Sequence, residues 1–275
     1  MYTVTKIQAS QNLKSDIQKI IQPIIGNISD FIKPTDRILL KPNFNTADPF
    51  PGSTAMDFLQ AVIEIFSEVK PKELIIGESC TYFLNTEKVC RLKGTPAVME
   101  KFNVTWHNFE IGDWVKVDVP GGQYFKSIKI PKIVKEVDKI ILLPCLKTHF
   151  LAAYTGALKI NIGMLKPSQR SLLHLNHLQE RVAEVASVIK PNLIIMDGRK
   201  CFTEKGPDKG KLEEPNILMA GNDMVAMDVE GLKILQGYKA ENKLGTDPWA
   251  LTQIKRAVEL GIGSKSASDY QLMEI

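Results

Sequence analysis

The stretch from Lys139 to Gln179 has the residue types of a site for a negatively charged ligand. It contains no aspartate or glutamate, although the 275-residue chain has 31 acidic residues. Its cations and histidines are Lys139, Lys147, His149, Lys159, Lys166, Arg170, His174 and His177. A lysine in a partly desolvated, cation-rich pocket has a lowered pKa and can act as a base or nucleophile, and a histidine can shuttle protons near neutrality. These cations alternate with small and apolar residues, which favours a ligand site over the alternative, a solvated basic face.

His149 and Lys159 are the central catalytic candidates, and His174 is the third. Ten residues separate the first two, so they can meet only if the segment 151–158 turns back on itself. Gly156 and its small neighbours permit such a turn. The alternative is a hydrogen-bonded turn histidine and a lysine on the surface of a helix.

Polar residues follow several apolar runs at the points where strands are expected to end. The expected strands cover residues 37–40, 74–77, 140–143 and 193–196, and the polar residues after them are Lys41, Asn43, Glu78, Lys147, His149 and Asp197. Because the carboxyl ends of parallel strands share one edge of a sheet, we expect these side chains and Lys159 to line one cleft. Taken singly, each is also a common capping or turn residue.

The expected ligand of this cleft is a small anionic molecule. Lysine, arginine and main-chain N–H groups at a glycine turn can hold a carboxylate or a phosphate. The residues expected to bind it are Lys41, Asn43, Thr54, Glu78, Lys147, Thr155, Gly156, Asn161, Lys166 and Asp197. Lys147, Lys159 and Lys166 would supply the positive charge.

Strands and helices alternate along the chain. Further strands are expected at 2–8 and 217–220, and helices at 11–25, 54–69, 86–102, 168–189, 223–236 and 247–260. Extended pieces near 104–110, 114–119 and 124–130 predict an antiparallel insertion. The pattern predicts an α/β fold with a mainly parallel central sheet flanked by helices and a small antiparallel β insertion near 104–130. We expect a single domain over residues 1–275, with two lobes as the alternative.

Composition and charge predict a cytoplasmic protein that binds neither membranes nor nucleic acid. The net charge is only +4, the aromatic content is 7%, and no aromatic residues are interleaved with the cations. No apolar run approaches the length of a membrane span, and no secretory signal is visible at the N-terminus. The four cysteines, at positions 80, 90, 145 and 201, are far apart and unpaired in sequence, unlike zinc ribbons or iron–sulfur binding runs. Sequence names neither a cofactor nor an oligomeric state.

No standard phosphate-loop or nucleophile motif accounts for the site. The segment 206–211 has glycines at Gly206 and Gly210, but Leu212 stands where a phosphate loop needs serine or threonine. There is no G-x-G-x-x-G after the first strand and no G-x-S-x-G elbow.

Two histidines of the stretch have a spacing that could place them side by side on a helix. His174 and His177 are three residues apart, and with Cys145 or His149 they could bind a metal. No carboxylate lies nearby in sequence and the surroundings are cationic, so no metal site is predicted.

A series of short motifs resembles the domain of unknown function 362 (DUF362) family of bacteria and archaea. They are Lys41-Pro42-Asn43 with Thr54, Lys147-Thr148-His149, Tyr154 to Lys159 with Gly163 and a downstream histidine, Ile195 to Gly198, Gly206-Pro207 with Gly210, and Gly221 to Asp228. The resemblance covers nearly the whole chain in the expected order. The family's activity is largely undefined. Some members carry a ferredoxin-like cysteine cluster, which this chain lacks, so electron transfer is not implied here.

The segment from His149 to Lys159 is also similar to the N-terminal domain of nickel-dependent lactate racemases. In that group the histidine is catalytic and the lysine holds a nickel-pincer nucleotide covalently; a later histidine corresponds to His174 or, less closely, His177. The Asp-x-Thr-Arg-Pro and Gly-Thr-His motifs of the racemases are not reproduced here. The resemblance therefore implies shared ancestry of the scaffold and not racemization.

The leading hypothesis is an enzyme of an uncharacterised family acting on a small anionic metabolite by proton or hydride transfer, as in isomerases or oxidoreductases. The alternative is a non-catalytic accessory protein that binds a nucleotide or phosphorylated cofactor. An enzyme needs a titratable pair facing a closed cavity, whereas a binder needs only the anion-holding groups.

Overall fold

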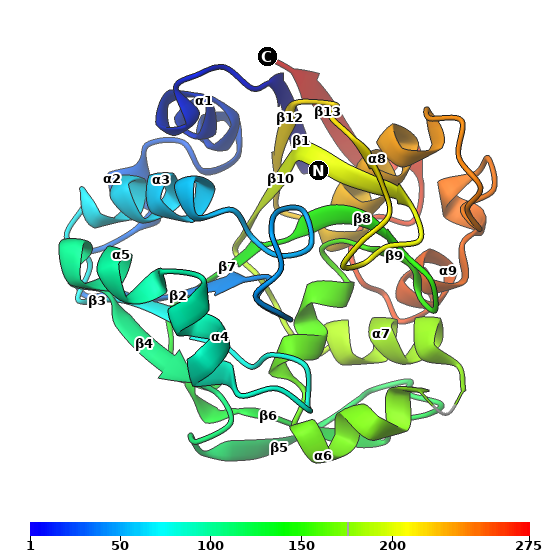
Figure 1. The fold of residues 1–275 in the computed structure, drawn as a ribbon, viewed down its shortest axis with the longest axis horizontal. Helices are drawn as coiled ribbons and strands as arrows, with labels where there is room; N and C mark the ends of the chain where they lie inside the picture. Colours follow the sequence, from blue (N-terminus) through cyan, green and yellow to red (C-terminus); the bar gives the residue numbers. More distant parts are fainter. Residues whose placement is uncertain (175) are drawn as a thin grey trace.

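One large mixed sheet forms the centre of the computed structural model, which describes residues 1–174 and 176–275 without the side chain of His174 (Figure 1). Its strands are β1 (Tyr2–Gln8), β2 (Arg37–Pro42), β3 (Glu73–Glu78), β4 (Thr105–Asn108), β7 (Lys139–Leu143), β8 (Cys145–His149), β9 (Ala153–Thr155), β10 (Leu193–Glu204), β11 (Lys211–Glu213), β12 (Ile217–Gly221) and β13 (Tyr270–Glu274). The main order is β13-β1-β12-β10-β7-β2-β3-β4, with β11 and β8 paired to β10 and β9 paired to β8. Strands β5 (Trp114–Asp118) and β6 (Ser127–Pro131) form a separate antiparallel pair.

The pairings confirm the expected fold class. The neighbours β4, β3, β2, β7 and β10 are all parallel, while β12 joins β10 and β1 in antiparallel fashion. Parallel strands need crossover connections, and here helices supply most of them.

Helices cover both faces of the sheet. The α-helices are α1 (Leu13–Ile25), α2 (Ile28–Phe31), α3 (Met56–Ser67), α4 (Thr86–Leu92), α5 (Thr95–Phe102), α6 (Pro167–Arg170), α7 (Leu178–Ala186), α8 (Met224–Gln236) and α9 (Thr252–Glu259). Short 3₁₀ helices are η1 (Lys132–Lys135), η2 (Lys159–Met164), η3 (Ser171–His174), η4 (Pro248–Ala250) and η5 (Ala267–Asp269). Figure 1 shows α1 beside α3 and α7 beside α9, on different sides of the molecule. In the described part of the chain, no helix combines the length and apolarity needed to cross a bilayer.

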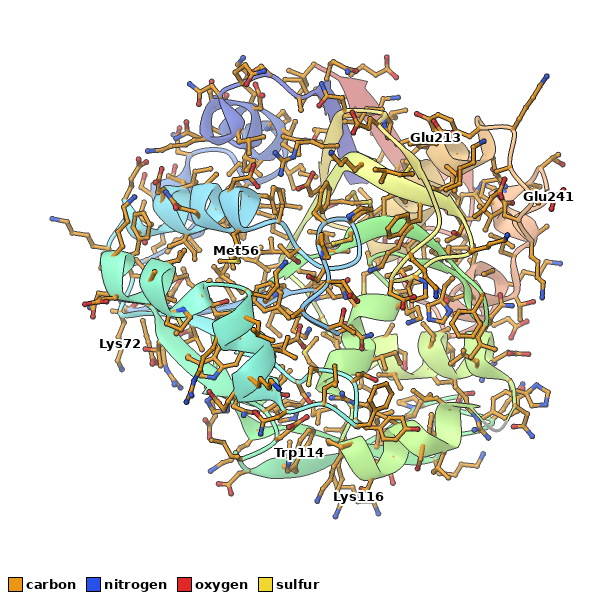
Figure 2. All side chains as sticks on the ribbon, in the orientation of Figure 1. Met56, Lys72, Trp114, Lys116, Glu213 and Glu241 are labelled. Atoms are coloured by element: carbon orange, nitrogen blue, oxygen red, sulfur yellow. The ribbon has the colours of Figure 1, made fainter. Side chains whose placement is uncertain are left out.

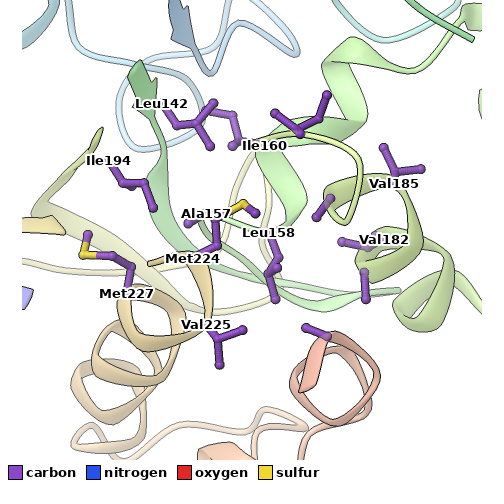
Figure 3. Close-up of a cluster of buried hydrophobic side chains, with 14 of the residues drawn as sticks. Leu142, Ala157, Leu158, Ile160, Val182, Val185, Ile194, Met224, Val225 and Met227 are labelled. Carbon is purple, nitrogen blue, oxygen red and sulfur yellow. The ribbon is translucent and has the colours of Figure 1, made fainter. Parts of the chain in front are cut away.

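Side-chain alternation along the strands creates two cores. In β2, Leu39 belongs to the core under α7, α8 and α9, whereas Leu40 belongs to the core under α1 and α3. Leu142 and Ile141 of β7 divide in the same way, as expected for a strand buried on both faces. Figure 3 shows the first core, in which Leu142 and Ile194 lie near residues of η2, α7 and α8.

Some polar side chains lie at the periphery, and others cap helices. Figure 2 shows Lys116 and Glu241 projecting from the edge of the molecule. Asn12 accepts a hydrogen bond from the Ser15 N–H at the start of α1, and Asp223 accepts one from Ala226 at the start of α8. Such N-caps satisfy amide groups that have no partner within the helix.

The expected antiparallel insertion is smaller than predicted. Strand β4 pairs parallel with β3 at the edge of the main sheet, so only β5 and β6 form the insertion. The prediction for residues near 104–110 was therefore wrong. The reason is that helices α4 and α5 intervene between β3 and β4, which returns β4 to the same sheet in the same direction.

Three expected helices are interrupted, and one of them, the region 247–260, divides into η4 and α9. The region 86–102 breaks at Gly94, whose φ is 77°, and the region 168–189 divides into α6, η3 and α7. His177 precedes α7 with a φ of 51°. A residue in the left-handed region cannot continue a right-handed helix, and the apolar periodicity did not reveal either break.

Strand β10 is longer than expected and includes Asp197 in its interior. The prediction that Asp197 follows the end of this strand was wrong. The strand continues to Glu204 because β8, β11 and β12 supply pairing partners beyond Met196. Strands β8, β9, β11 and β13 were not predicted, since they are short or polar.

The role of the first core is tested by Leu142→Ala. Leu142 is fully buried in this core, so its truncation should lower the free energy of unfolding by about 2–5 kcal/mol. Urea denaturation followed by circular dichroism measures the change. Leu92→Ala is the control, because that side chain is 66% exposed and should change stability by less than about 0.5 kcal/mol. Equal effects of both substitutions would contradict the assignment.

Candidate functional site

A cavity of about 120 Å³ lies beside the carboxyl ends of β2, β3 and β8. It is lined by Lys41, Asn43, Asn45, Glu78, Ser79, Thr81, Tyr82, Lys147, His149, Thr155, Lys159, Ile160, Ile162, Gly163, Arg170, Leu173, Leu178 and Pro207. Seven residues predicted from sequence thus meet here: Lys41, Asn43, Glu78, Lys147, His149, Thr155 and Lys159. Carboxyl ends of parallel strands are the usual ligand position in open α/β sheets.

Lys41 and Glu78 form a buried ion pair in the wall of the cavity. Lys41 Nζ lies 2.5 Å from Glu78 Oε1, and both side chains are at most 2% exposed. The Glu78 carboxylate also accepts hydrogen bonds from the Phe44 and Ser79 amides at 2.8 Å. Desolvation lowers the pKa of Lys41, although Glu78 opposes the shift. The carboxylate is therefore already neutralised by protein groups.

Lys147 and Arg170 are buried cations with no carboxylate within ion-pair distance in the described structure. Lys147 Nζ donates to the Asn43 side-chain oxygen at 3.2 Å and to the Gly52 carbonyl. Arg170 donates to four main-chain carbonyls, those of Leu165, Ser79, Cys80 and Gly163. Burial lowers the pKa of both groups. Carbonyl dipoles hold these cations in place without cancelling their charge.

Lys159 is a further cation of the cavity whose pKa is lowered. Burial, and secondarily the positive charge of Lys147, lower the pKa of its ammonium group to about 8. Within the described residues, its Nζ makes no hydrogen bond or ion pair. The Thr155 hydroxyl, another lining group, is buried and also has no hydrogen-bond partner there. Unpaired polar groups in a cavity indicate a place for a polar ligand.

His149 is held in one tautomer by its own turn. Its Nδ1 accepts hydrogen bonds from the Leu151 and Ala152 amides, each at 3.1 Å. A ring nitrogen that accepts two N–H groups carries no proton, so the proton of the neutral imidazole is on Nε2. His149 is therefore suited to donate a hydrogen bond from Nε2. It is not suited to accept one at Nδ1.

Asp228 of α8 anchors the turn that presents Thr155 and Lys159. Its carboxylate accepts hydrogen bonds from the Ala157 amide at 2.5 Å, the Leu158 amide at 3.0 Å and the Tyr154 hydroxyl at 3.0 Å. Burial raises the pKa of Asp228 to about 7, against the effect of these donors. The expected turn between residues 151 and 158 thus exists: β9 runs back antiparallel to β8, and the anchored amides of Ala157 and Leu158 lead into η2.

Glycines allow the close approaches around the site. A Cβ on Gly156 would lie 2.2 Å from Asp228 Oδ1, and a Cβ on Gly163 would lie 2.7 Å from Lys41 Nζ. Gly156 does not line the cavity, so its place in the site is to admit the anchor and not to contact a ligand.

Other predicted binding residues lie outside the cavity lining. Asp197 pairs with Arg199 at 2.8 Å within β10, because the strand continues past it. The Thr54 hydroxyl accepts a hydrogen bond from the Asn43 amide at 2.7 Å. The Asn161 amide donates to the carbonyls of its own turn.

Two predicted site residues remain, Lys166 and His174. Lys166 begins α6 at its N-cap and does not line the cavity. The side chain of the third catalytic candidate, His174, lies outside the described residues.

Sequence reasoning missed Arg170 and Asp228 as site residues. Arg170 belongs to the acid-free stretch, which was the available signal. Asp228 is a single acid within the apolar run Met224 to Val229, a placement that costs free energy unless the carboxylate is satisfied.

The donor set of the cavity suits an anion better than a metal. No three histidine, cysteine, aspartate or glutamate side chains come together as a metal-binding group within the described residues. His177 instead contacts Tyr124 at 3.0 Å and Glu180 at 3.3 Å. Cations and an unpaired hydroxyl would hold a carboxylate or a phosphate.

The anchor is tested by Gly156→Ala. The added methyl group would displace the Asp228 carboxylate, and losing buried hydrogen bonds should cost about 1–3 kcal/mol of stability. Gly237→Ala is a control, because Gly237 is exposed with a φ of −67° and tolerates a side chain. Urea unfolding compares the two variants. A Gly156→Ala protein as stable as the control would contradict the anchoring role.

The chain has relatives of known sequence and structure. It is 27% identical over 255 residues to the "Thylakoid-associated protein sll1697" of Synechocystis, covering 87% of this chain and 77% of that protein. The apoprotein of lactate racemase from Thermoanaerobacterium thermosaccharolyticum has a similar fold, with a TM-score of 0.50 and 12% identity over 80% of this chain. This chain spans 54% of that racemase. Residues 38–233 match the family described as domain of unknown function (DUF362). The chain therefore belongs to the DUF362 family.

Proposed function

We propose that this protein is an enzyme that binds a small carboxylate or phosphate in the cavity and transfers a proton at a carbon next to a carbonyl group. One observation carries the proposal: Lys41, Lys147, Lys159 and Arg170 surround the cavity, and the one carboxylate among the lining residues, Glu78, is already neutralised. The excess positive charge in a desolvated space favours an anion.

The anionic group of the ligand would lie near Lys147 and Arg170. These cations are buried and fixed by carbonyl groups, so little reorganisation is needed when charge develops nearby. The negative charge of an enolate would be stabilised by the same field.

Lys159 and His149 are suited to complementary roles. A lysine with a pKa of about 8 is partly neutral near physiological pH, so its amine can take the proton from carbon. The electron pair then moves to the carbonyl oxygen, which accepts a hydrogen bond from His149 Nε2–H. The fixed tautomer of His149 supports this donor role.

Anion affinity should depend on the protonation of Lys159. As pH rises through about 8, the ammonium loses its charge and holds an anion less well. If only the protonated form binds, the dissociation constant for inorganic phosphate should rise up to about tenfold between pH 7 and pH 9. Isothermal titration calorimetry at low salt, with the ionisation of phosphate itself taken into account, measures this change.

Lys159→Met should bind phosphate more weakly and lose most of this pH dependence. Lys166→Met, from the same acid-free stretch but outside the cavity lining, should behave as the parent protein. If the parent binds no phosphate or small carboxylate at low salt, the proposal is wrong.

Catalysis is tested by exchange of carbon-bound protons. Small 2-oxo carboxylates in D₂O should exchange their C3 protons with solvent in the presence of the protein, as measured by proton NMR. Lys159→Met should slow exchange by about 10²-fold or more, because it removes the base.

His149→Asn is a second variant, which removes one hydrogen-bond donor and keeps the acceptor. The asparagine oxygen can still accept the Leu151 and Ala152 amides, but the Nε2 donor is gone, so exchange should slow by about 10²-fold while thermal unfolding stays unchanged. Binding without exchange across the panel would instead favour the non-catalytic accessory protein.

A further inference from the structure

The cavity holds only part of a ligand. Its volume of about 120 Å³ is close to that of an engineered cavity that accommodates one benzene molecule, roughly 150 Å³. A carboxylate or phosphate with a few adjoining atoms fills such a space. The remainder of any larger ligand would extend through the mouth.

A second hollow adjoins the cavity on one side. It has a volume of about 380 Å³ and shares Leu173 and Leu178 with the cavity, and Leu151 is also in its wall. Its other lining residues are polar: Asn176, His177, Gln179, Glu180 and Thr252. The residues common to the two linings are therefore leucines, of which Leu173 is only 2% exposed.

Exposed apolar side chains lie at, or next in sequence to, residues that line the two hollows. Tyr82 and Phe83, after β3, are 52% and 72% exposed, and Phe150 and Leu151, after β8, are 62% and 47% exposed. Leu172, just before the shared Leu173, is 41% exposed. Scattered exposed apolar residues are normal, but a group of them beside a cavity marks a binding surface.

The aromatic rings of this group pack against other rings. Tyr82 and Phe83 meet edge to face with centroids 5.3 Å apart, and the Phe150 ring stacks on His149 at 5.2 Å. Ordered rings on two sides of a cationic cavity offer flat apolar contacts to whatever projects from it.

From these features we infer that the ligand is an amphiphilic anion: a carboxylate or phosphate monoester whose charged group enters the cavity and whose alkyl or aryl group lies across Leu151 and Leu178. The inference rests on the proposed anion site and adds the class of substrate. The cations supply charge complementarity at one end, and the leucines of the mostly polar hollow supply apolar contact at the other.

A chain-length series tests the inference. The probes are acetate, butyrate, hexanoate and octanoate, with inorganic phosphate and hexyl phosphate as the phosphate arm and hexan-1-ol as the uncharged control. Affinity measured by calorimetry should rise about two- to fourfold for each added methylene until the hollow is filled. The arm with the tighter binding identifies the head group.

Leu151→Ser should flatten the series while leaving acetate and inorganic phosphate binding unchanged, because it alters only the apolar path. Leu92→Ser, also an exposed leucine but on α4 and outside both linings, should retain the full series. Lys159→Met should weaken every charged probe, including the short ones.

Three outcomes would overturn the inference. If acetate or phosphate binds but chain length has no effect, the ligand class is wrong and the anion site stands. If hexan-1-ol binds as tightly as hexanoate, the apolar surface acts alone, as a protein-docking face would. If no charged probe binds, the proposed function fails and the inference fails with it.

Discussion

The burial of several cations around one small space is the constraint on which the site depends. Moving a charge out of water is costly unless other groups compensate it. Within the described residues, Lys41 is the only one of these cations with a carboxylate partner, Glu78, while Arg170 is held by four carbonyls. Carbonyl oxygens solvate a cation without neutralising it, so the positive potential remains in the cavity. The protein accepts lower stability there and keeps a preorganised positive field, which the proposed function uses to bind an anion.

The need for carbonyl groups that can solvate these cations explains why the backbone beside the sheet is irregular. Carbonyls inside regular helices and strands already accept hydrogen bonds, so the free ones come from turns and 3₁₀ segments such as η2 and the loop after β3. Irregular backbone needs its own support, and Asp228 provides it by accepting two consecutive amides. The lack of a side chain at Gly156 and Gly163 lets the anchor and the Lys41–Glu78 pair approach. The hydrophobic core, the turn that Asp228 anchors and the cavity with its cations are therefore structurally connected.

The similarity to the racemase apoprotein concerns the fold, at 12% identity and a TM-score of 0.50. A shared α/β scaffold fixes where a ligand lies, at the carboxyl ends of the strands, but not which reaction occurs. In this chain the chemistry depends on local details. Two amides fix the tautomer of His149, and burial lowers the pKa of Lys159 to about 8. Neither detail follows from the fold alone.

The sequence by itself determined the α/β class, most strands and helices, and the acid-free stretch that supplies His149, Lys147 and Lys159. These features are local: apolar periodicity and composition depend only on neighbouring residues. Tertiary structure decided the rest. It placed Asp197 inside β10 against Arg199, brought Arg170 to the cavity, and made Asp228 the anchor of the turn. Each of these depends on strand pairing or on contacts between residues far apart in the chain, such as the amide of Ala157 and the carboxylate of Asp228. No sequence pattern within either segment predicts this contact, because the packing of α8 against the sheet brings the two groups together.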